Sequence, residues 1–380
     1  MNRPLLINPQ IGINNFDIIR FLLASAVIFC HCFVMYYGYE PFTKSEPFMV
    51  LSQGQISIGS VAVDFFFIIS GFLIVRSFEY SKTNIEYLKK RILRIYPGFI
   101  VAFLISILFA GFVGELRNTG TNNYWQYLGN LHKKQELVHL FTLQSPNEKW
   151  YFKNMPQVGV NNSLWTIQFE FICYLLVPVI AFLGFFKKKF LFIVSFLVVY
   201  VILYLQLKGW ILPFKESNNL FLGNTYHLPR FTTYFLSGAC FYIFRAKIFK
   251  SNFFAILSFA AIAFSFVWVK CVDQVLPVAG SYLLFYTAYH PALQFSKFSK
   301  RGDYSYGLYL YGWPIQQVVM YFLAIHLNPF RFFFIAYPLV LAFAYFSWHF
   351  IEKRCLHFKT RKPSPVISIN HPSILTEGVN

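Results

Sequence analysis

Arg20 and His31 lie on the first long apolar stretch of the chain, FDIIRFLLASAVIFCHCFVMYY, where a membrane helix would ordinarily carry no ionisable group. At helical rise the two residues lie about 16 Å apart along the axis, more than half the thickness of a hydrocarbon core. Ionisable groups in lipid usually face a cavity or a partner, so the pair indicates chemistry across a membrane. Two other interpretations stay open. Arg20 can extend to the lipid headgroups, and His31 can be a neutral histidine hydrogen-bonded between helices.

The composition excludes an ordinary soluble domain. The 380 residues are 57% hydrophobic and 13% charged, and the mean hydropathy is +0.50. We therefore predict an all-α polytopic membrane protein with about ten transmembrane helices. The apolar runs cover residues 16–37, 57–76, 92–113, 164–184, 190–207, 230–246, 253–270, 275–293, 304–325 and 332–351.

The distribution of Lys and Arg predicts the orientation, because these residues favour cytoplasmic loops. With both termini in the cytoplasm, about two thirds of the 33 Lys and Arg residues lie on the inner side. The net charge of +18 is then explained by topology and anionic lipid headgroups, without nucleic acid. The inner clusters are Lys89, Lys90, Arg91 and Arg94; Lys187 to Lys189; Arg245, Lys247 and Lys250; Lys297, Lys300 and Arg301; and Lys353 and Arg354.

The chain divides into a membrane domain, residues 1–355, and a tail, residues 356–380, that we expect to be disordered and cytoplasmic. The first apolar run is too long for a cleavable signal and is expected to be retained. The longest connection, residues 114–163, is expected outside the membrane and is long enough to be functional. The cysteines show no zinc-ligand spacing, so no metal site is expected, and we interpret most of them as buried thiols.

Two carboxylates are predicted to share the depth of His31. Counted from the cytoplasmic end of each span, His31 lies at about 23 Å, Asp64 at about 18 Å and Glu170 at about 21 Å, whereas Arg20 lies at only about 6 Å. Each carboxylate has a second interpretation: Asp64 can pair with a neighbouring helix, and Glu170 can be solvated near the outer interface. Depth alone does not show whether the three groups face one another.

This arrangement predicts a base near the outer side and cations near the inner side. Histidine is a natural general base for a sugar hydroxyl, and Asp64 or Glu170 would orient the ring of His31. Arg20, Arg91 and Arg94 would position phosphate groups through their fork geometry. The alternative for the segment KKRILR is that it only marks the cytoplasmic end of a span.

Three aromatic residues are candidates for binding a sugar ring: Trp165, Tyr309 and Trp313. Aromatic side chains present large flat apolar faces. The alternative is an interfacial belt, since Trp and Tyr gather at membrane interfaces.

Along most of its length the chain resembles the acyltransferase-3 family of integral membrane acyltransferases. The family's first helix carries Arg and His separated by ten residues, as Arg20 and His31 are here. Five further strings match family motifs: AVDFFFIISGFLI from Ala62, KRILRIYP from Lys90, SLWTIQFEFICYLL from Ser163, SYGLYLYGWP from Ser305 and FIEKRCL from Phe350.

Four positions depart from the family pattern. Ala62 replaces a glycine, Phe171 a glutamate, Gly312 a histidine and Arg354 a proline. Because Gly312 has no side chain that could take the role of the family's histidine, His31 is the leading candidate for the base.

The resemblance implies transfer of an acyl group, commonly acetyl from cytoplasmic acetyl-CoA, to a hydroxyl of an extracytoplasmic glycan or glycolipid, such as the O-antigen of lipopolysaccharide. The expected location is the bacterial cytoplasmic membrane. The phosphates of CoA would bind near Arg91 and Arg94, with Arg20 on the route inward. No hydrolase-like domain is appended in the given sequence, which favours direct transfer.

Two other classes of function are weighed. A secondary transporter or glycan flippase would also carry ionisable residues near the midplane, but the halves of this chain show no internal symmetry. A scaffold or sensor would tolerate changes at both His31 and Arg94.

Overall fold

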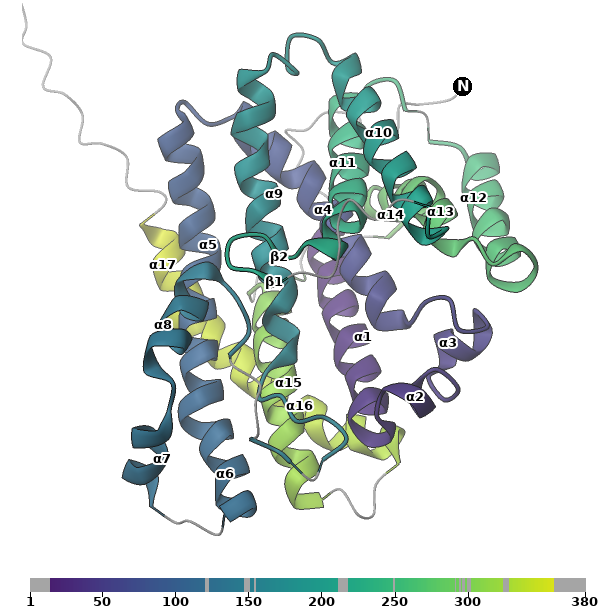
Figure 1. The fold of residues 1–380 in the computed structure, drawn as a ribbon. Coiled ribbons are helices and arrows are strands. Elements are labelled where there is room, and N and C mark those ends of the chain that lie inside the picture. Colours follow the sequence, from purple (N-terminus) through teal and green to yellow (C-terminus); the bar gives the residue numbers. More distant parts are fainter. Residues whose placement is uncertain are drawn as a thin grey trace, which may run out of the picture.

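The computed structural model describes residues 14–119, 123–146, 151–153, 155–210, 218–248, 250–290, 292–293, 295, 298, 302–323 and 328–358. Within these ranges the protein is a bundle of helices with a single two-residue antiparallel pairing (Figure 1). The all-α prediction is confirmed. The α-helices are α1 (Phe16–Tyr37), α2 (Tyr39–Phe42), α3 (Pro47–Leu51), α4 (Ile58–Glu79), α5 (Asn84–Ile105), α6 (Phe112–Thr119), α7 (Tyr124–Asn130), α8 (Lys133–Thr142), α9 (Trp165–Phe182), α10 (Phe190–Leu207), α11 (Leu228–Ile243), α12 (Asn252–Phe264), α13 (Val272–Val275), α14 (Ser281–Ala288), α15 (Ser305–Leu323), α16 (Pro329–Ser347) and α17 (Lys353–His357).

Short segments of other geometry connect or extend these helices. They are the π-helices η1 (Ser106–Gly111), η4 (Ser265–Val269), η5 (Leu276–Gly280) and η8 (Trp348–Glu352), the 3₁₀ helices η2 (Asn162–Leu164) and η3 (Thr225–His227), and the strands β1 (Asn218–Asn219) and β2 (Gly223–Asn224).

Seven helical segments among the described residues are long and apolar enough to cross a membrane. They are Phe16–Tyr37, Ile58–Glu79, Asn84–Leu116, Asn162–Phe182, Phe190–Leu207, Asn252–Val269 and Pro329–His357. They correspond to seven of the ten predicted runs. The other three runs coincide with α11, with η5 followed by α14, and with α15, so each is helical. The protein is a polytopic membrane protein, and the count of ten spans with cytoplasmic termini stays a prediction.

The closest packing in the bundle lies between α4 and α11. A Cβ atom built on Gly71 of α4 would lie 1.9 Å from the carbonyl oxygen of Phe235. One built on Gly238 of α11 would lie 1.9 Å from the carbonyl oxygen of Ile68. Small residues allow helix backbones to approach in a membrane, where packing rather than water exclusion drives association. These two glycines therefore set the separation of α4 and α11.

A second group of helices surrounds α1. The helix α1 packs against α4, α15 and α16, so helices from the beginning and the end of the described sequence lie side by side (Figure 1). Gly307 of α15 faces Ala344 of α16, where a Cβ would lie 2.8 Å from the Ala344 Cα atom. The start of α15 is thereby held close to α1 and α5, which carry the predicted arginines.

Parts of the sequence predictions fall outside the described residues. The described part of the connection 114–163 contains α7 and α8, with a short 3₁₀ turn before α9. Of the predicted tail, residues 356 and 357 belong to α17, and residues 359–380 are outside the described ranges. The same holds for the cluster Lys297, Lys300 and Arg301.

Candidate active site

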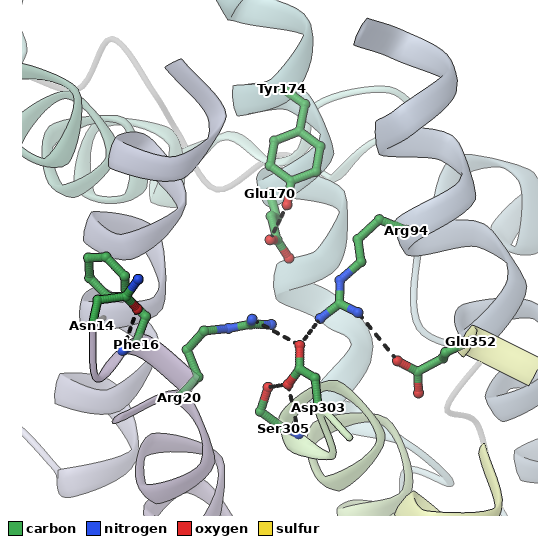
Figure 2. A network of polar contacts seen from close by, with 9 residues as sticks. All are labelled: Asn14, Phe16, Arg20, Arg94, Glu170, Tyr174, Asp303, Ser305 and Glu352. Atoms are coloured by element: carbon green, nitrogen blue, oxygen red, sulfur yellow. Dashed lines mark hydrogen bonds and ion pairs between the residues drawn. The ribbon is translucent and has the colours of Figure 1, made fainter. Parts of the chain in front are cut away.

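Arg20 of α1 and Arg94 of α5 meet on one carboxylate, that of Asp303. The Arg20 Nη1 atom lies 2.9 Å from Asp303 Oδ2, and the Arg94 Nη2 atom lies 2.6 Å from the same oxygen (Figure 2). Arg94 has a second acidic partner, Glu352 of η8, at 3.6 Å. The structure thus brings two of the three predicted cations together and pairs both with Asp303, which is largely shielded from solvent.

Asp303 is held in place by the start of α15. Its Oδ1 atom accepts hydrogen bonds from the Ser305 hydroxyl at 2.5 Å and from the Ser305 backbone N–H at 3.3 Å. Burial would raise the pKa of this carboxyl, but Arg20 and Arg94 outweigh it, so the pKa lies well below its usual range. The carboxylate is therefore charged and pulls the two guanidinium groups toward α15.

Neither acidic partner was predicted from the sequence. Asp303 stands two residues before the string that begins at Ser305, and Glu352 lies inside the string FIEKRCL. The available signal was that Arg20, placed inside an apolar span, requires an anionic partner or a cavity.

Arg91 differs from the other two arginines. Its Nη2 atom donates to the Ser77 hydroxyl at 3.1 Å, and its guanidinium lies 5.9 Å and 5.8 Å from the ring centres of Tyr87 and Tyr174. Its Nε atom is buried and has no hydrogen-bond partner. No ion pair within the described ranges joins Arg91 to a carboxylate. This cation is therefore the one that is best placed to accept an anionic ligand.

All three arginines line one cavity, which has an empty volume of ≈ 890 Å³ including space open to solvent. The walls are mostly apolar and aromatic. The lining residues are Arg20, Val63, Phe66, Phe67, Ile69, Ser70, Leu73, Ile74, Arg91, Arg94, Ile95, Thr166, Glu170, Tyr174, Ser305, Tyr306 and Tyr309.

Glu170 is the predicted carboxylate that lines this cavity. Its Oε1 atom accepts a hydrogen bond from the Tyr174 hydroxyl, one turn along α9 (Figure 2). Arg94 lines the same cavity and His31 does not, so Glu170 is near the cations rather than near the predicted base.

Asp64 lies elsewhere. It is fully buried, and both its oxygens accept hydrogen bonds from Arg230 of α11, at 3.0 Å from Nε and 2.8 Å from Nη2. The second interpretation of Asp64, pairing with a neighbouring helix, is therefore the one that the geometry supports. Arg230 was not predicted as this partner. The available signal was its position at the beginning of a predicted span, where a cation can pair with a buried carboxylate.

His31 has no carboxylate partner within the described ranges. Its side chain is partly buried, its ring packs edge-on against Trp313 with the centres 4.8 Å apart, and its Nδ1 atom is buried without a hydrogen bond. The structure does not bring His31 together with Asp64 or Glu170, because Arg230 and Tyr174 hold those two carboxylates. A shared depth did not place them on a shared face.

The three predicted sugar-binding aromatics do not form one surface. Trp165 packs against His227 and Phe231 and remains 39% exposed. Tyr309 lines the cavity, and its hydroxyl is hydrogen-bonded to Thr166. Trp313 lies one helical turn beyond Tyr309 and donates its indole N–H to the Gly159 carbonyl at 2.9 Å. No ring contact within the described ranges joins these three side chains, so a common floor is not confirmed.

Comparison with known proteins gives a family match over most of the chain. A family model described as an acyltransferase domain matches residues 13–349. An O-acetyl transferase of Shigella phage Sf6 is 28% identical over 364 residues, which cover 94% of this chain and 99% of that protein. Nodulation protein 10 of Rhizobium leguminosarum bv. viciae is 30% identical over 169 residues, 44% of each chain. No solved structure matches significantly.

Proposed function

The chain belongs to the acyltransferase-3 family of integral membrane acyltransferases and is an O-acetyltransferase, and we propose that its donor is acetyl-CoA, taken from the cytoplasmic side. The proposed acceptor is a hydroxyl of an extracytoplasmic glycan, such as an O-antigen or another surface polysaccharide. The proposed location is the cytoplasmic membrane of a bacterium.

This proposal rests on the cavity that Arg91 lines. CoA is a polyanion with a long flexible arm, and the cavity combines an arginine without a carboxylate partner with mostly apolar walls. Along α4 the lining runs from Ile74 to Val63, a rise of about 16 Å. That length suits an extended pantetheine arm. Phosphates would bind at the Arg91 end, and the thioester would lie toward Tyr309.

His31 lies just beyond the Tyr309 end of the cavity, because Trp313, which packs on its ring, follows Tyr309 by one helical turn. In the proposed reaction, His31 takes the proton from the acceptor hydroxyl, and the hydroxyl oxygen attacks the thioester carbon. The C–O bond forms, the C–S bond breaks, and the leaving thiolate receives the proton from the imidazolium. A variant of this path has His31 carry the acetyl group briefly, since imidazole can act as a nucleophile.

The test compares His31→Ala with the parent chain in cells that carry the acceptor glycan. The readout is base-labile acetyl ester on surface polysaccharide, with the amount of protein in the membrane measured in parallel. We expect a loss of about 10²–10⁴-fold, the usual contribution of a general base. His132→Ala is the matched control, because His132 is an exposed histidine between α7 and α8. A folded and inserted His31→Ala protein that acetylates at the parent rate would contradict the proposal.

A further inference from the structure

A buried amide on α15, that of Gln316, lies against the ring of His31. Gln316 is fully buried. Its Nε2 atom donates to the carbonyl oxygen of Ile28 at 2.8 Å and to the sulfur of Cys32 at 2.9 Å. Ile28 and Cys32 lie one turn apart on α1, on either side of His31 in the sequence. The amide group is thereby held in contact with the imidazole.

The two side chains leave complementary atoms without partners. The Oε1 atom of Gln316 is buried and accepts no hydrogen bond, and the Nδ1 atom of His31 is buried and has none. A buried polar atom without a partner is costly, so an unpaired ring nitrogen and an unpaired amide oxygen on adjacent side chains indicate a bond that completes in the working enzyme. Hydrogen bonds of catalytic groups are often long or misaligned before substrate binds.

Other groups that could serve His31 are already engaged. Asp64 is held by Arg230 and Glu170 by Tyr174, as described above. Trp313 presents only its ring to His31, because its N–H donates to Gly159. Within the described part of the chain, Gln316 therefore supplies the unengaged acceptor next to this ring.

We propose that Gln316 is the positioning residue of His31, its Oε1 atom accepting the Nδ1–H of the neutral ring. This fixes the tautomer in which Nε2 carries the lone pair. The Nδ1 atom is inaccessible, whereas His31 as a whole is only partly buried, so the accessible edge of the ring is the one that carries Nε2. The Nε2 atom is therefore free to take a proton from the acceptor hydroxyl. A neutral amide takes the orienting role that a carboxylate has in other histidine sites.

This inference rests on the proposed function, since it assigns a partner to the base proposed there. Its first test needs no variant at Gln316. Nitrogen NMR of the full chain in lipid vesicles, with ¹⁵N-labelled histidine and at a pH where the ring is neutral, reports which nitrogen of His31 carries the proton. The His31 signals are assigned by their loss in His31→Ala. We expect Nδ1–H, and a spectrum showing Nε2–H would overturn the assignment.

The second test compares two variants of adjacent buried glutamines. Gln316→Met removes the acceptor, whereas Gln317→Met removes a buried amide that donates to the Gln157 carbonyl. Transfer from radiolabelled acetyl-CoA is measured in membranes that contain the native glycan. For Gln316→Met we expect kcat to fall about 10–100-fold, as for orienting partners of other functional histidines. We expect the KM for acetyl-CoA to be unchanged. Gln317→Met should retain kcat when corrected for folded protein.

Equal losses of kcat in the two variants would overturn the positioning role. If Gln316→Met does not fold, the NMR spectrum of the parent chain still shows which nitrogen of His31 carries the proton. The outcome also separates the two proposals. An active His31→Ala protein removes the proposed function, whereas an inactive His31→Ala protein together with an Nε2–H spectrum removes only the role of Gln316.

Discussion

At the scale of single residues, three arginines that look alike in the sequence have different partners in the structure. They are Arg20, Arg91 and Arg94. Arg20 and Arg94 share Asp303, so their charges are already compensated inside the protein. Arg91 has a serine and two aromatic rings as its partners and keeps one buried N–H unpaired. Removing a member of a buried ion pair leaves a charge without compensation, whereas removing Arg91 leaves no carboxylate behind.

We predict that Arg91→Gln weakens acetyl-CoA binding about tenfold, because one charge-assisted hydrogen bond is worth about 1.5–3 kcal/mol. The melting temperature should stay close to that of the parent. Binding is measured by isothermal titration of the full chain in nanodiscs with acetyl-CoA alone. Lys90→Gln is the control, since the adjacent Lys90 is paired with Glu86 at 2.6 Å. Unchanged binding in Arg91→Gln, or an equal loss in Lys90→Gln, would contradict this assignment.

At the scale of elements, the contact between α4 and α11 combines close backbone approach with a buried ion pair. Gly71 and Gly238 bring the helices together, and Asp64 and Arg230 join them nearer the other end of the interface. The side chain of Asp64 is completely shielded, whereas that of Arg230 is 27% exposed. The ion pair holds α4 in position, and α4 forms one wall of the cavity.

We expect Gly71→Ala to destabilise the protein strongly, because its new methyl group would overlap the Phe235 carbonyl, which is backbone and has little room to move. Overpacking of this kind costs about 1–3 kcal/mol or more. The readout is thermal unfolding in detergent. Gly129→Ala on α7 is the control, since nothing lies within 4 Å of the added atom. A parent-like melting curve for Gly71→Ala would show that α4 and α11 are not packed in this way.

The ion pair gives a second prediction for the same interface. Arg230→Met alone leaves Asp64 buried without compensation and should destabilise the fold by about 3–5 kcal/mol. The double variant with Asp64→Leu should recover much of that stability, because no buried charge remains. Acetyl transfer should return with the fold. A double variant that is stable yet inactive would instead show that the Asp64 carboxylate takes part in the reaction.

At the scale of the whole molecule, the three arginines line the cavity, whereas His31, the proposed base, lies just beyond it and at a different depth. Arg91 lies two turns from the beginning of α5, near the connection between α4 and α5, whereas His31 lies near the end of α1. The turn between α9 and α10, which contains Lys187 to Lys189, lies at the same end of the bundle as the α4–α5 connection (Figure 1). A donor that enters at this end would come from the cytoplasm under the charge rule.

Orientation is tested by labelling single cysteines with a membrane-impermeant maleimide in intact cells. We expect Lys208→Cys, after α10, to react from outside, and Lys188→Cys, before α10, to react only after the membrane is permeabilised, because Lys and Arg concentrate on inner loops. The parent chain is the control for its own cysteines. The reverse pattern would place the donor site outside and remove the cytoplasmic source of acetyl-CoA.

Much of the architecture followed from the sequence alone. Apolar runs of spanning length identify helices because lipid offers the backbone no hydrogen bonds. The run 190–207 has the same bounds as α10, and Arg20, Arg91, Arg94, Glu170 and Tyr309 all line one cavity. Helix ends were less well predicted where π-helical turns extend a span, as η1 extends α5.

Only the tertiary structure decided which polar groups are partners. Asp303 meets Arg20 across 283 positions of sequence, and Asp64 meets Arg230 across 166. Residue type and depth place a group along the membrane normal, but rotation about each helix axis and the choice of neighbouring helix decide what it faces. Those two quantities depend on close packing at small residues such as Gly71, so Gln316, rather than either predicted carboxylate, lies beside His31.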